Sequence, residues 1–199
     1  MTPPASIIVP LESVTERLDL ARLFAALQPL EVELGSGDGS FLARYAALHP
    51  ERNFLGVERL LGRLRKLDRK CQRASLANTR ALRIEAAYLL EWLLPPRSVS
   101  ALHIYFPDPW PKRKHRRHRL INSRFPALSH AALVTGGAVY LRTDDADYFA
   151  QMQSVFAASP LFRAVETPSE LAAVITDFER NFHRQQIPTL SAAYLAGRE

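Results

Sequence analysis

Short runs of β-branched and other apolar residues alternate with helical segments along most of the chain. Between the first predicted strands, 40–48 and 60–74 carry apolar residues at the spacing that places them on one helical face. This alternation is typical of an α/β fold with a mostly parallel central sheet flanked by helices. The predicted strands are 30–34, 53–58, 79–85, 99–106, 138–143, 162–166 and 188–194.

No repeat or low-complexity linker interrupts the 199 residues, and 47% of them are apolar, enough for a globular core. We therefore expect a single domain over residues 1–199. Only the first dozen residues and the segment 107–119 lack a clear packing pattern. We expect residues 1–12 to be loosely packed and flexible, and 107–119 to form a loop.

Several classes of protein are disfavoured by features that the sequence lacks. There is no apolar run of about 18 residues, and the N-terminus lacks the basic start and apolar stretch of a secretory signal. We therefore expect a cytoplasmic protein without membrane contact or an obligate protein partner. Cys71 is the single cysteine and has no ligand-spaced neighbour, so we expect a passive helical thiol, with no disulfide and no metal site.

Polar residues follow five consecutive predicted strands. The ends of parallel strands joined by right-handed crossovers meet at one edge of a sheet, where ligands bind. Any one of these acids has an alternative role in capping a helix or forming a turn. Their repetition favours a binding site at this edge. The residues are the loop 35–39, Glu58, Glu85, Asp108 and Asp144.

The loop in EVELGSGDGSF predicts a nucleoside cofactor. Gly35, Gly37 and Gly39 permit a sharp turn and a close approach of the backbone to a ligand. Glu58 follows about twenty residues later, at the distance of a carboxylate that binds a ribose diol. Glu33 would repel a diphosphate but attract a sulfonium and an amino group. S-adenosylmethionine therefore fits better than NAD, and no GxxxxGK[ST] loop supports ATP or GTP.

A second motif, FPDPWPKRKHRRHR, places an acid between two prolines and in front of eight consecutive Lys, Arg or His residues. The prolines favour extended geometry at Phe106 and Asp108. Trp110 either stacks on a base or covers the sheet edge. The cations of 112–119 can neutralise RNA phosphates, and the net charge of +6 also favours a polyanionic partner. From this run we expect RNA contacts by Lys112, His115, Arg116 and Arg119.

The GSGDG loop resembles motif I of class I S-adenosylmethionine-dependent methyltransferases. The segment FPDPWPKRKHRRHRLI is similar to the signature of the bacterial tRNA (guanine-N7)-methyltransferase family, and the resemblance includes LRTDDADYFAQM and TDFERNF further along. It implies a Rossmann-like methyltransferase of one domain. The implied reaction is methyl transfer from S-adenosylmethionine to N7 of guanosine 46 in the variable loop of tRNA.

The resemblance also assigns roles to individual residues. Glu58 would bind the ribose hydroxyls, Glu85 and Ala86 would lie near the adenine, and Asp108 would lie where cofactor and guanine meet. Two positions depart from the family, since Glu85 stands for the usual aspartate and Gln186 for a common glycine. The implied cofactor residues also include Glu33 and Gly35, and the implied substrate residues are Lys112, Asp144, Thr176 and Glu179.

The chemistry explains why acids are expected beside a guanine. N7 carries a lone pair and no proton, so it needs no general base to become a nucleophile. Positive charge moves from sulfur to the ring as the methyl group transfers, and a fixed carboxylate stabilises that charge. Asp108 and Asp144 are therefore the predicted catalytic residues.

Three other functions stay open at this point. They are a methyltransferase acting on a small nucleophile, an RNA-binding protein of this fold without activity, and an NAD-dependent oxidoreductase. Thr176 and Glu179 have an alternative of their own, because Thr-x-x-Glu is also the pattern of a helix capping box.

Overall fold

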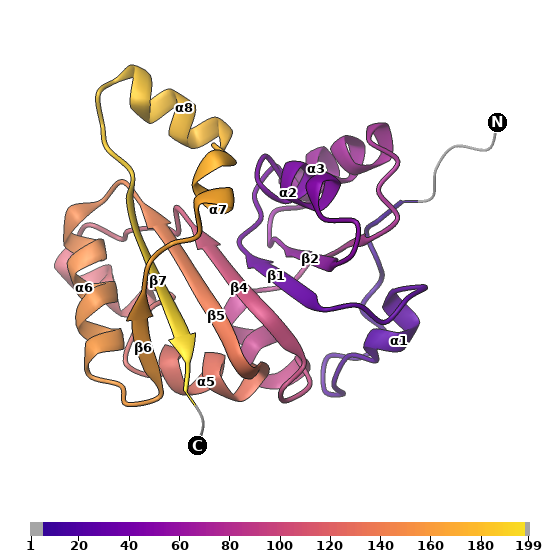
Figure 1. Ribbon diagram of the computed structural model, residues 1–199, viewed down its shortest axis with the longest axis horizontal. Coiled ribbons are helices and arrows are strands. Elements are labelled where there is room, and N and C mark those ends of the chain that lie inside the picture. Colours follow the sequence, from indigo (N-terminus) through magenta and orange to yellow (C-terminus); the bar gives the residue numbers. More distant parts are fainter. Residues whose placement is uncertain (1–5, 198–199) are drawn as a thin grey trace. The chain divides into compact units, whose positions relative to one another are not determined.

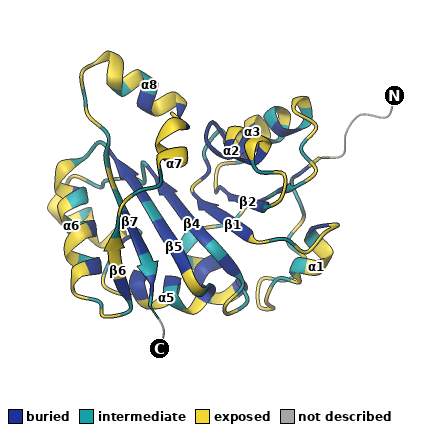
Figure 2. Cartoon of the chain, viewed as in Figure 1, coloured by how far each residue is buried: buried dark blue, intermediate teal, exposed yellow. Residues whose placement is uncertain are grey.

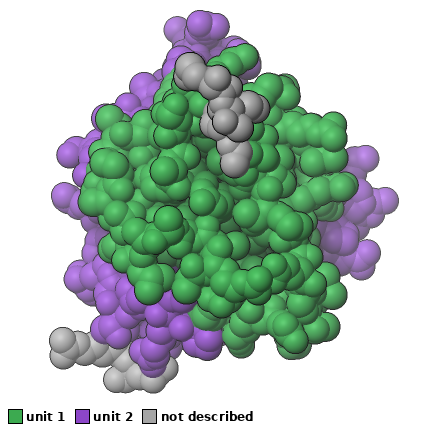
Figure 3. Space-filling view, turned by 90° about the vertical axis from the view of Figure 1, so that its right-hand side faces the viewer, with its two compact units in different colours: residues 1–95 green, residues 96–199 purple. Residues whose placement is uncertain are grey.

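The computed structural model describes residues 6–197, and Figure 1 labels its helices and strands. The chain divides into two compact units, residues 1–95 and 96–199, which Figure 3 distinguishes by colour. The expectation of a single domain stays a prediction.

The first unit holds three parallel strands in the order β3-β2-β1. β1 and β2 are buried along their whole length (Figure 2), as expected for strands of a parallel sheet. The elements are α1 (Leu20–Leu23), β1 (Leu30–Leu34), α2 (Leu42–Leu48), β2 (Asn53–Val57), α3 (Leu61–Arg73), β3 (Thr79–Leu82), α4 (Ala86–Tyr88) and the π-helix η1 (Leu89–Leu93).

The second unit holds four strands in the order β4-β5-β7-β6. β4 and β5 are parallel, whereas β7 runs antiparallel to both of its neighbours. The elements are β4 (Val99–Tyr105), the 3-10 helix η2 (Arg113–His118), α5 (Phe125–Ala132), β5 (Leu133–Thr143), α6 (Ala146–Ala157), β6 (Phe162–Val165), α7 (Ser169–Ala173), α8 (Asp177–Arg184) and β7 (Leu190–Ala196).

The strand predictions are confirmed at all seven places, with two boundaries that differ by more than two residues. β3 ends at Leu82 rather than at residue 85. β5 begins at Leu133, five residues before the predicted start, and its pairing with β4 is irregular between Leu133 and Ala138. Gly136 in that stretch has a φ of 76°. The predicted strand began directly after Gly136 and Gly137, whereas in the structure these two glycines form an irregular part of β5.

The start of the described chain differs from expectation. Residues 7–9 were expected to be loosely packed, but they pair with the edge of β3. Val9 N donates to Ala81 O at 3.0 Å and Ala81 N donates to Ile7 O at 2.8 Å. Ile7 is buried. Pairing here satisfies backbone groups that an edge strand would otherwise expose. Residues 1–5 of the predicted flexible segment lie outside the described residues.

No helix within residues 6–197 combines the length and apolar character needed to cross a membrane.

Cys71 lies on the buried face of α3 together with Leu64 and Leu67. Burial raises the pKa of its thiol to about 12, and the negative charge of Asp68 adds to the increase. The thiol therefore stays protonated at physiological pH, as expected for a passive cysteine.

We expect Cys71 in the native protein to resist alkylation by iodoacetamide at mildly alkaline pH, because the thiolate is the reactive form. In denaturant the same thiol should react at the rate of a free cysteine. Mass spectrometry over a time course measures both rates. Equal rates in the two states would contradict the buried location.

Gln186, which stands where the family commonly has a glycine, lies just after the end of α8. Ile187 N donates to Phe182 O at 3.0 Å, and Gln186 N donates to His183 O at 3.1 Å. These two bonds form a Schellman motif, whose C′ residue adopts a left-handed backbone and is usually glycine. Gln186 occupies that position with a φ of 60°. The turn is thus retained, although Gln186 has a Cβ that makes the left-handed backbone strained.

We expect Gln186→Gly to raise the free energy of unfolding by about 0.5–1 kcal/mol, because glycine adopts the left-handed region without strain. Gln185→Gly is the matched control. Gln185 has a φ of −94°, so glycine there should lower stability through its extra freedom in the unfolded chain. Urea denaturation of the two variants measures both changes, and a destabilised Gln186→Gly protein would refute the strain.

Candidate functional site

The glycine-rich loop turns back on the end of β2. Gly35 N and Ser36 N both donate to Val57 O, at 2.9 and 2.8 Å. Gly35, Gly37 and Gly39 all have positive φ, at 84°, 54° and 75°. This conformation strains residues that have a Cβ, so the loop depends on its glycines.

The three glycines differ in what lies beside them. A Cβ on Gly39 would lie 2.2 Å from Leu67 Cδ1, so this glycine permits the loop to pack against α3. A Cβ on Gly35 or Gly37 would have no neighbouring atom within 4 Å. The backbone is therefore open to a ligand at Gly35 and Gly37 and closed by packing at Gly39.

Glu58 braces the loop. The side chain is buried, with its residue 7% exposed, and it follows β2 directly. Its Oε2 accepts a hydrogen bond from Gly37 N at 3.1 Å, and its Oε1 accepts one from Leu60 N at 2.7 Å. A carboxylate has about four acceptor positions. Glu58 thus orients the loop and still has capacity for hydroxyl donors such as those of a ribose.

Two further buried polar residues flank the loop. Glu33 is the fourth residue of β1 and is 3% exposed. The Ser36 hydroxyl is buried and has no hydrogen-bond partner among residues 6–197. A buried polar group of this kind is costly unless it is satisfied by something else. The loop therefore offers both a negative charge and an unused hydroxyl close to its backbone.

Asp38, at the tip of the loop, is tied to α3. Lys70 Nζ lies 2.9 Å from Asp38 Oδ2, and Ser40 N donates to Asp38 Oδ1 at 3.2 Å. Burial by itself raises the pKa of Asp38, but the hydrogen bond and positive charge of Lys70 outweigh it and hold the pKa below its usual value. The loop is thus fixed to α3 by packing at one residue and by an ion pair at another.

Glu85 and Ala86 follow β3 and not β1, the strand that leads into the glycine-rich loop. Glu85 is exposed three residues after the end of β3, and its side chain accepts a hydrogen bond from Tyr88 N at 2.8 Å. It is the N-cap of α4, in which Ala86 is the first residue. The capping role considered for acids after strands therefore applies to Glu85, and contact with an adenine stays a prediction.

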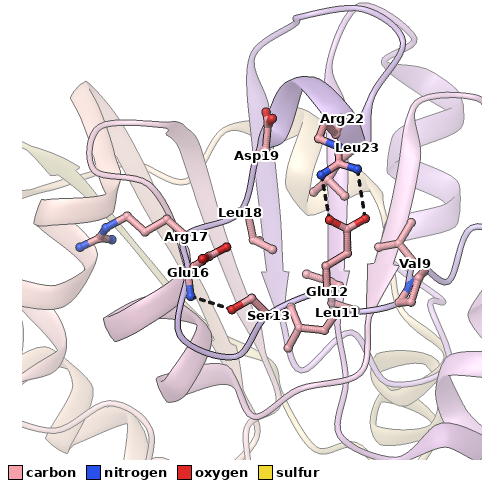
Figure 4. A pocket seen from close by; sticks show the side chains of 12 residues that line it. Val9, Leu11, Glu12, Ser13, Glu16, Arg17, Leu18, Asp19, Arg22 and Leu23 are labelled. Atoms are coloured by element: carbon pink, nitrogen blue, oxygen red, sulfur yellow. Dashed lines mark hydrogen bonds and ion pairs between the residues drawn. The ribbon is translucent and has the colours of Figure 1, made fainter.

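The first unit also has a pocket of about 260 Å³ beside its N-terminal segment (Figure 4). Figure 4 shows Arg22 and Glu12 paired across it, with a 2.8 Å contact between side chains that are about two thirds exposed. Val9, Leu18 and Leu82 supply apolar lining. None of the residues predicted to bind cofactor lines this pocket, so it is separate from the glycine-rich loop.

In the second unit, the PDPW segment begins with a left-handed residue. Phe106 has a φ of 52°, so the prediction of extended geometry there is wrong. The reason is packing. Its N–H continues the sheet by donating to Arg142 O at 2.8 Å, while its ring lies 5.6 Å from Phe182 and 6.4 Å from Phe178 on α8. Such strained residues occur often at functional sites.

Asp108 and Asp144, which follow β4 and β5, differ from Asp145, the acid next to Asp144. Asp108 is exposed, Asp144 is partly exposed, and neither has a hydrogen-bond or ion-pair partner within the described part of the chain. Asp145 instead caps α6 by accepting a hydrogen bond from Tyr148 N at 2.7 Å. Of the acids that follow β4 and β5, Asp108 and Asp144 are therefore available to a ligand.

Arg119 has a different role from the one predicted. It is 1% exposed, and its guanidinium donates to Pro109 O at 2.7 Å, Gln151 Oε1 at 2.7 Å and Asp147 Oδ2 at 2.6 Å. It also lies 4.7 Å from the ring centre of Tyr148. These contacts hold the PDPW segment to α6, so Arg119 positions the loop instead of facing RNA.

Asp147 receives a second cation from the basic run, because Arg116 Nη2 lies 3.0 Å from its Oδ1. The hydrogen bond from Arg119, together with the charges of both arginines, holds the pKa of Asp147 below its usual value despite some opposing desolvation. The Arg116 side chain is 44% exposed, so it is still accessible from solvent.

The remaining cations of the run face solvent. Exposed and without an ion pair among residues 6–197 are Lys112, Arg113, Lys114 and Arg117. Two histidines of η2 pack on Trp110, with ring centres 5.9 Å away for His115 and 5.2 Å away for His118. Trp110 is partly buried by these histidines. Four cations are thus available for phosphates.

Thr176 and Glu179 form the capping box of α8. Thr176 Oγ1 accepts a hydrogen bond from Glu179 N at 3.0 Å, and Glu179 Oε2 accepts one from Thr176 N at 2.7 Å. Both are buried, and Glu179 also pairs with Arg142 at 3.0 Å. The capping alternative is confirmed, and substrate contact by these residues stays a prediction.

The predicted site residues thus gather in two groups. The glycine-rich loop, Glu33 and Glu58 lie together in the first unit. The PDPW segment, η2 and the start of α6 are linked in the second unit through Arg119. Within residues 6–197 no group of three or more His, Cys, Asp or Glu side chains is arranged to hold a metal ion.

A family model described as that of a methyltransferase, Methyltransf_4, matches residues 27–192. The chain belongs to this methyltransferase family. A tRNA (guanine-N(7)-)-methyltransferase of Syntrophotalea carbinolica is 39% identical over 137 residues, which cover 69% of this chain and 59% of that protein. Another, of Sodalis glossinidius, is 33% identical over 172 residues, which cover 84% of this chain and 72% of that protein.

The predicted membership of the bacterial tRNA (guanine-N7)-methyltransferase family is therefore confirmed, although the chain spans only about three fifths of the length of the first of these relatives. The crystal structure of the 16S rRNA methyltransferase KamB has a TM-score of 0.63 and 17% identity, and the match covers 92% of this chain and 95% of that one. The predicted Rossmann-like class I methyltransferase fold is confirmed by this likeness.

One charged surface was missed in the sequence. Along α3, cations occupy most of the positions that face solvent, and this became apparent only when the buried positions Leu64, Leu67 and Cys71 were known. The signal was present in RLLGRLRKLDRKCQR, which holds seven Lys or Arg residues and one acid.

We expect Gly39→Ala to lower the free energy of unfolding by about 2–4 kcal/mol, because the new Cβ overlaps Leu67 and the φ of 75° strains alanine. Gly62→Ala, in an open position on α3, is the control and should be neutral or stabilising by up to about 1 kcal/mol. Thermal unfolding monitored by circular dichroism compares them. A Gly39→Ala protein as stable as the control would contradict the packing of the loop on α3.

Proposed function

We propose that this protein transfers a methyl group from S-adenosylmethionine to N7 of guanosine 46 in the variable loop of tRNA. The observation that carries the proposal is the pair of unpartnered acids, Asp108 and Asp144, in the same unit as a loop with four exposed, unpaired cations. Family membership supports the reaction type. The names of the relatives support the guanine N7 atom and the tRNA.

The first unit would bind the cofactor. Open backbone at Gly35 and Gly37 admits a ligand, and Glu58 has acceptor capacity beyond its two backbone contacts. Glu33 supplies a buried negative charge that suits a cationic ligand such as a sulfonium with an amino group. We assign Glu33, the three loop glycines and Glu58 to S-adenosylmethionine, with Glu85 and Ala86 toward its adenine.

The second unit would bind the guanine and its phosphates. Since N7 of guanine needs no deprotonation, the protein contributes orientation and charge stabilisation, of which orientation alone is worth roughly 7–11 kcal/mol in favourable reactions. Asp108 and Asp144 would stabilise the positive charge that develops on the ring. The left-handed Phe106 and the buried Arg119 fix the segment that carries Asp108 before RNA arrives.

The exposed cations would hold the RNA backbone. Lys112, Arg113, Lys114 and Arg117 have no ion-pair partner among residues 6–197 and can bind phosphates. His115 and Arg116 lie beside them in η2. We also assign contacts with the substrate nucleotide to Thr176 and Glu179. The reaction needs neither a metal ion nor a second protein, and a tRNA substrate implies work in the cytoplasm.

The deciding experiment is incubation of the protein with labelled S-adenosylmethionine and tRNA lacking modifications. Aniline cleavage at 7-methylguanosine then maps the product to one position. We expect a single cleavage at guanosine 46. Label in tRNA at a different atom or position would overturn the proposal.

The same assay distinguishes the three alternatives. A methyltransferase for a small nucleophile would leave the tRNA unlabelled and still bind S-adenosylmethionine in a calorimeter. An inactive RNA-binding protein would bind tRNA without binding the cofactor. An oxidoreductase would produce an absorbance change with a nicotinamide cofactor.

We expect Asp108→Asn and Asp144→Asn each to lower the rate of methyl transfer about 100-fold or more, because the charge that stabilises the transition state is lost. Binding of S-adenosylmethionine should weaken far less. Asp145→Asn is the matched control: it removes a neighbouring charge but keeps an N-cap of similar quality for α6. Single-turnover rates measure the effect, and an unchanged rate in either variant would reject its assigned role.

A further inference from the structure

The solvent-facing side of α3 carries a surface of uncompensated positive charge. Five exposed cations of the helix have no ion-pair partner in the described part of the chain, and together they define the α3 basic face. They are Arg63, Arg65, Lys66, Arg69 and Arg73.

The other charged residues of the helix are already used. Lys70 pairs with Asp38 of the glycine-rich loop. Asp68 is the one acid in the helix, and its carboxylate accepts hydrogen bonds from Ile7 N at 2.9 Å and from Gln72 Nε2 at 3.0 Å. No acid of α3 therefore neutralises the basic face.

The arrangement of the face is regular. Arg65, Arg69 and Arg73 recur at every fourth position, so they lie along one line with steps of about 6 Å. Like charges at this spacing repel one another and weaken a helix. A polyanion bound along the line would remove that repulsion.

We propose that the α3 basic face binds the phosphate backbone of RNA, as a second contact in addition to the basic run 112–119. The identity of the RNA as tRNA rests on the function proposed above. The chemistry favours RNA over a membrane surface, because Leu64, Leu67 and Cys71 are buried and the exposed side chains of α3 are all charged. Guanidinium groups also match phosphate geometry well.

The helix that carries the α3 basic face also contacts the glycine-rich loop. α3 supports the glycine-rich loop through Leu67 against Gly39 and through Lys70 with Asp38. RNA bound to α3 would therefore be held on the helix that shapes the proposed cofactor loop.

The test is tRNA binding by the variant Arg65→Gln/Arg69→Gln/Arg73→Gln over a range of salt concentrations. We expect the Kd to rise about tenfold or more, and the slope of log K against log salt to become less steep by about 2, as three phosphate contacts are lost. Affinity for S-adenosylmethionine should stay unchanged, which also checks that the protein is folded.

Two controls make the result specific. The triple lysine variant Arg65→Lys/Arg69→Lys/Arg73→Lys keeps the charge and should retain most of the affinity and slope. Arg163→Gln removes one exposed, unpaired arginine from β6 and should leave the Kd within about twofold.

The outcomes separate this inference from the proposed function. If the wild type methylates tRNA but the glutamine variant binds it with unchanged Kd and slope, the face does not bind RNA and the inference is overturned. If the wild type binds tRNA without methylating it, and the glutamine variant loses affinity, the inference stands while the function fails. Loss of binding to phosphatidylglycerol vesicles without loss of tRNA binding would also overturn it.

Discussion

The buried guanidinium of Arg119 is the interaction on which the geometry of the second unit depends most. A charge that is 1% exposed is tolerated only when its donors are satisfied, and here a proline carbonyl, an amide and a carboxylate satisfy them. Because Pro109 and Asp147 belong to different elements, one side chain fixes the PDPW segment to α6. The PDPW segment is thus held by Arg119, the buried last member of the basic run 112–119, whose other cations are exposed.

In the first unit, packing and backbone hydrogen bonds hold the glycine-rich loop in place. Its loop has to turn sharply at the end of a buried strand, and the turn is held by two N–H groups on one carbonyl, Val57 O. Gly39 fits because it has no Cβ to meet Leu67. Glu58 then adds a charged acceptor to Gly37 N. Each contact is modest alone, but together they fix a backbone that L-residues with side chains rarely adopt.

Local pattern was sufficient to predict the strands, because apolar runs separated by glycine and charged turns indicate a parallel α/β sheet with little ambiguity. The glycine-rich loop also followed from its place after a strand, as did the choice of Asp108 and Asp144 as candidate acids. Sequence did not reveal which members of a charge run are buried, since Arg119 differs from Arg117 only in its tertiary partners. It likewise missed the left-handed backbone of Phe106, whose aromatic contacts outweigh the preference of a residue before proline.

The carboxylate of Glu179 stabilises the start of α8 and pairs with a buried cation. It accepts from Thr176 N and, with both oxygens, from Arg142, so about one of its four acceptor positions is unoccupied. The edge of a guanine that carries N1 and N2 presents two neighbouring donors. A base that engaged Glu179 with both donors would have to displace either the backbone of Thr176 or the guanidinium of Arg142. Binding of such a base through both donors would therefore loosen the first turn of α8 or leave the buried guanidinium of Arg142 without its carboxylate. The packing around Glu179 would change when the base bound.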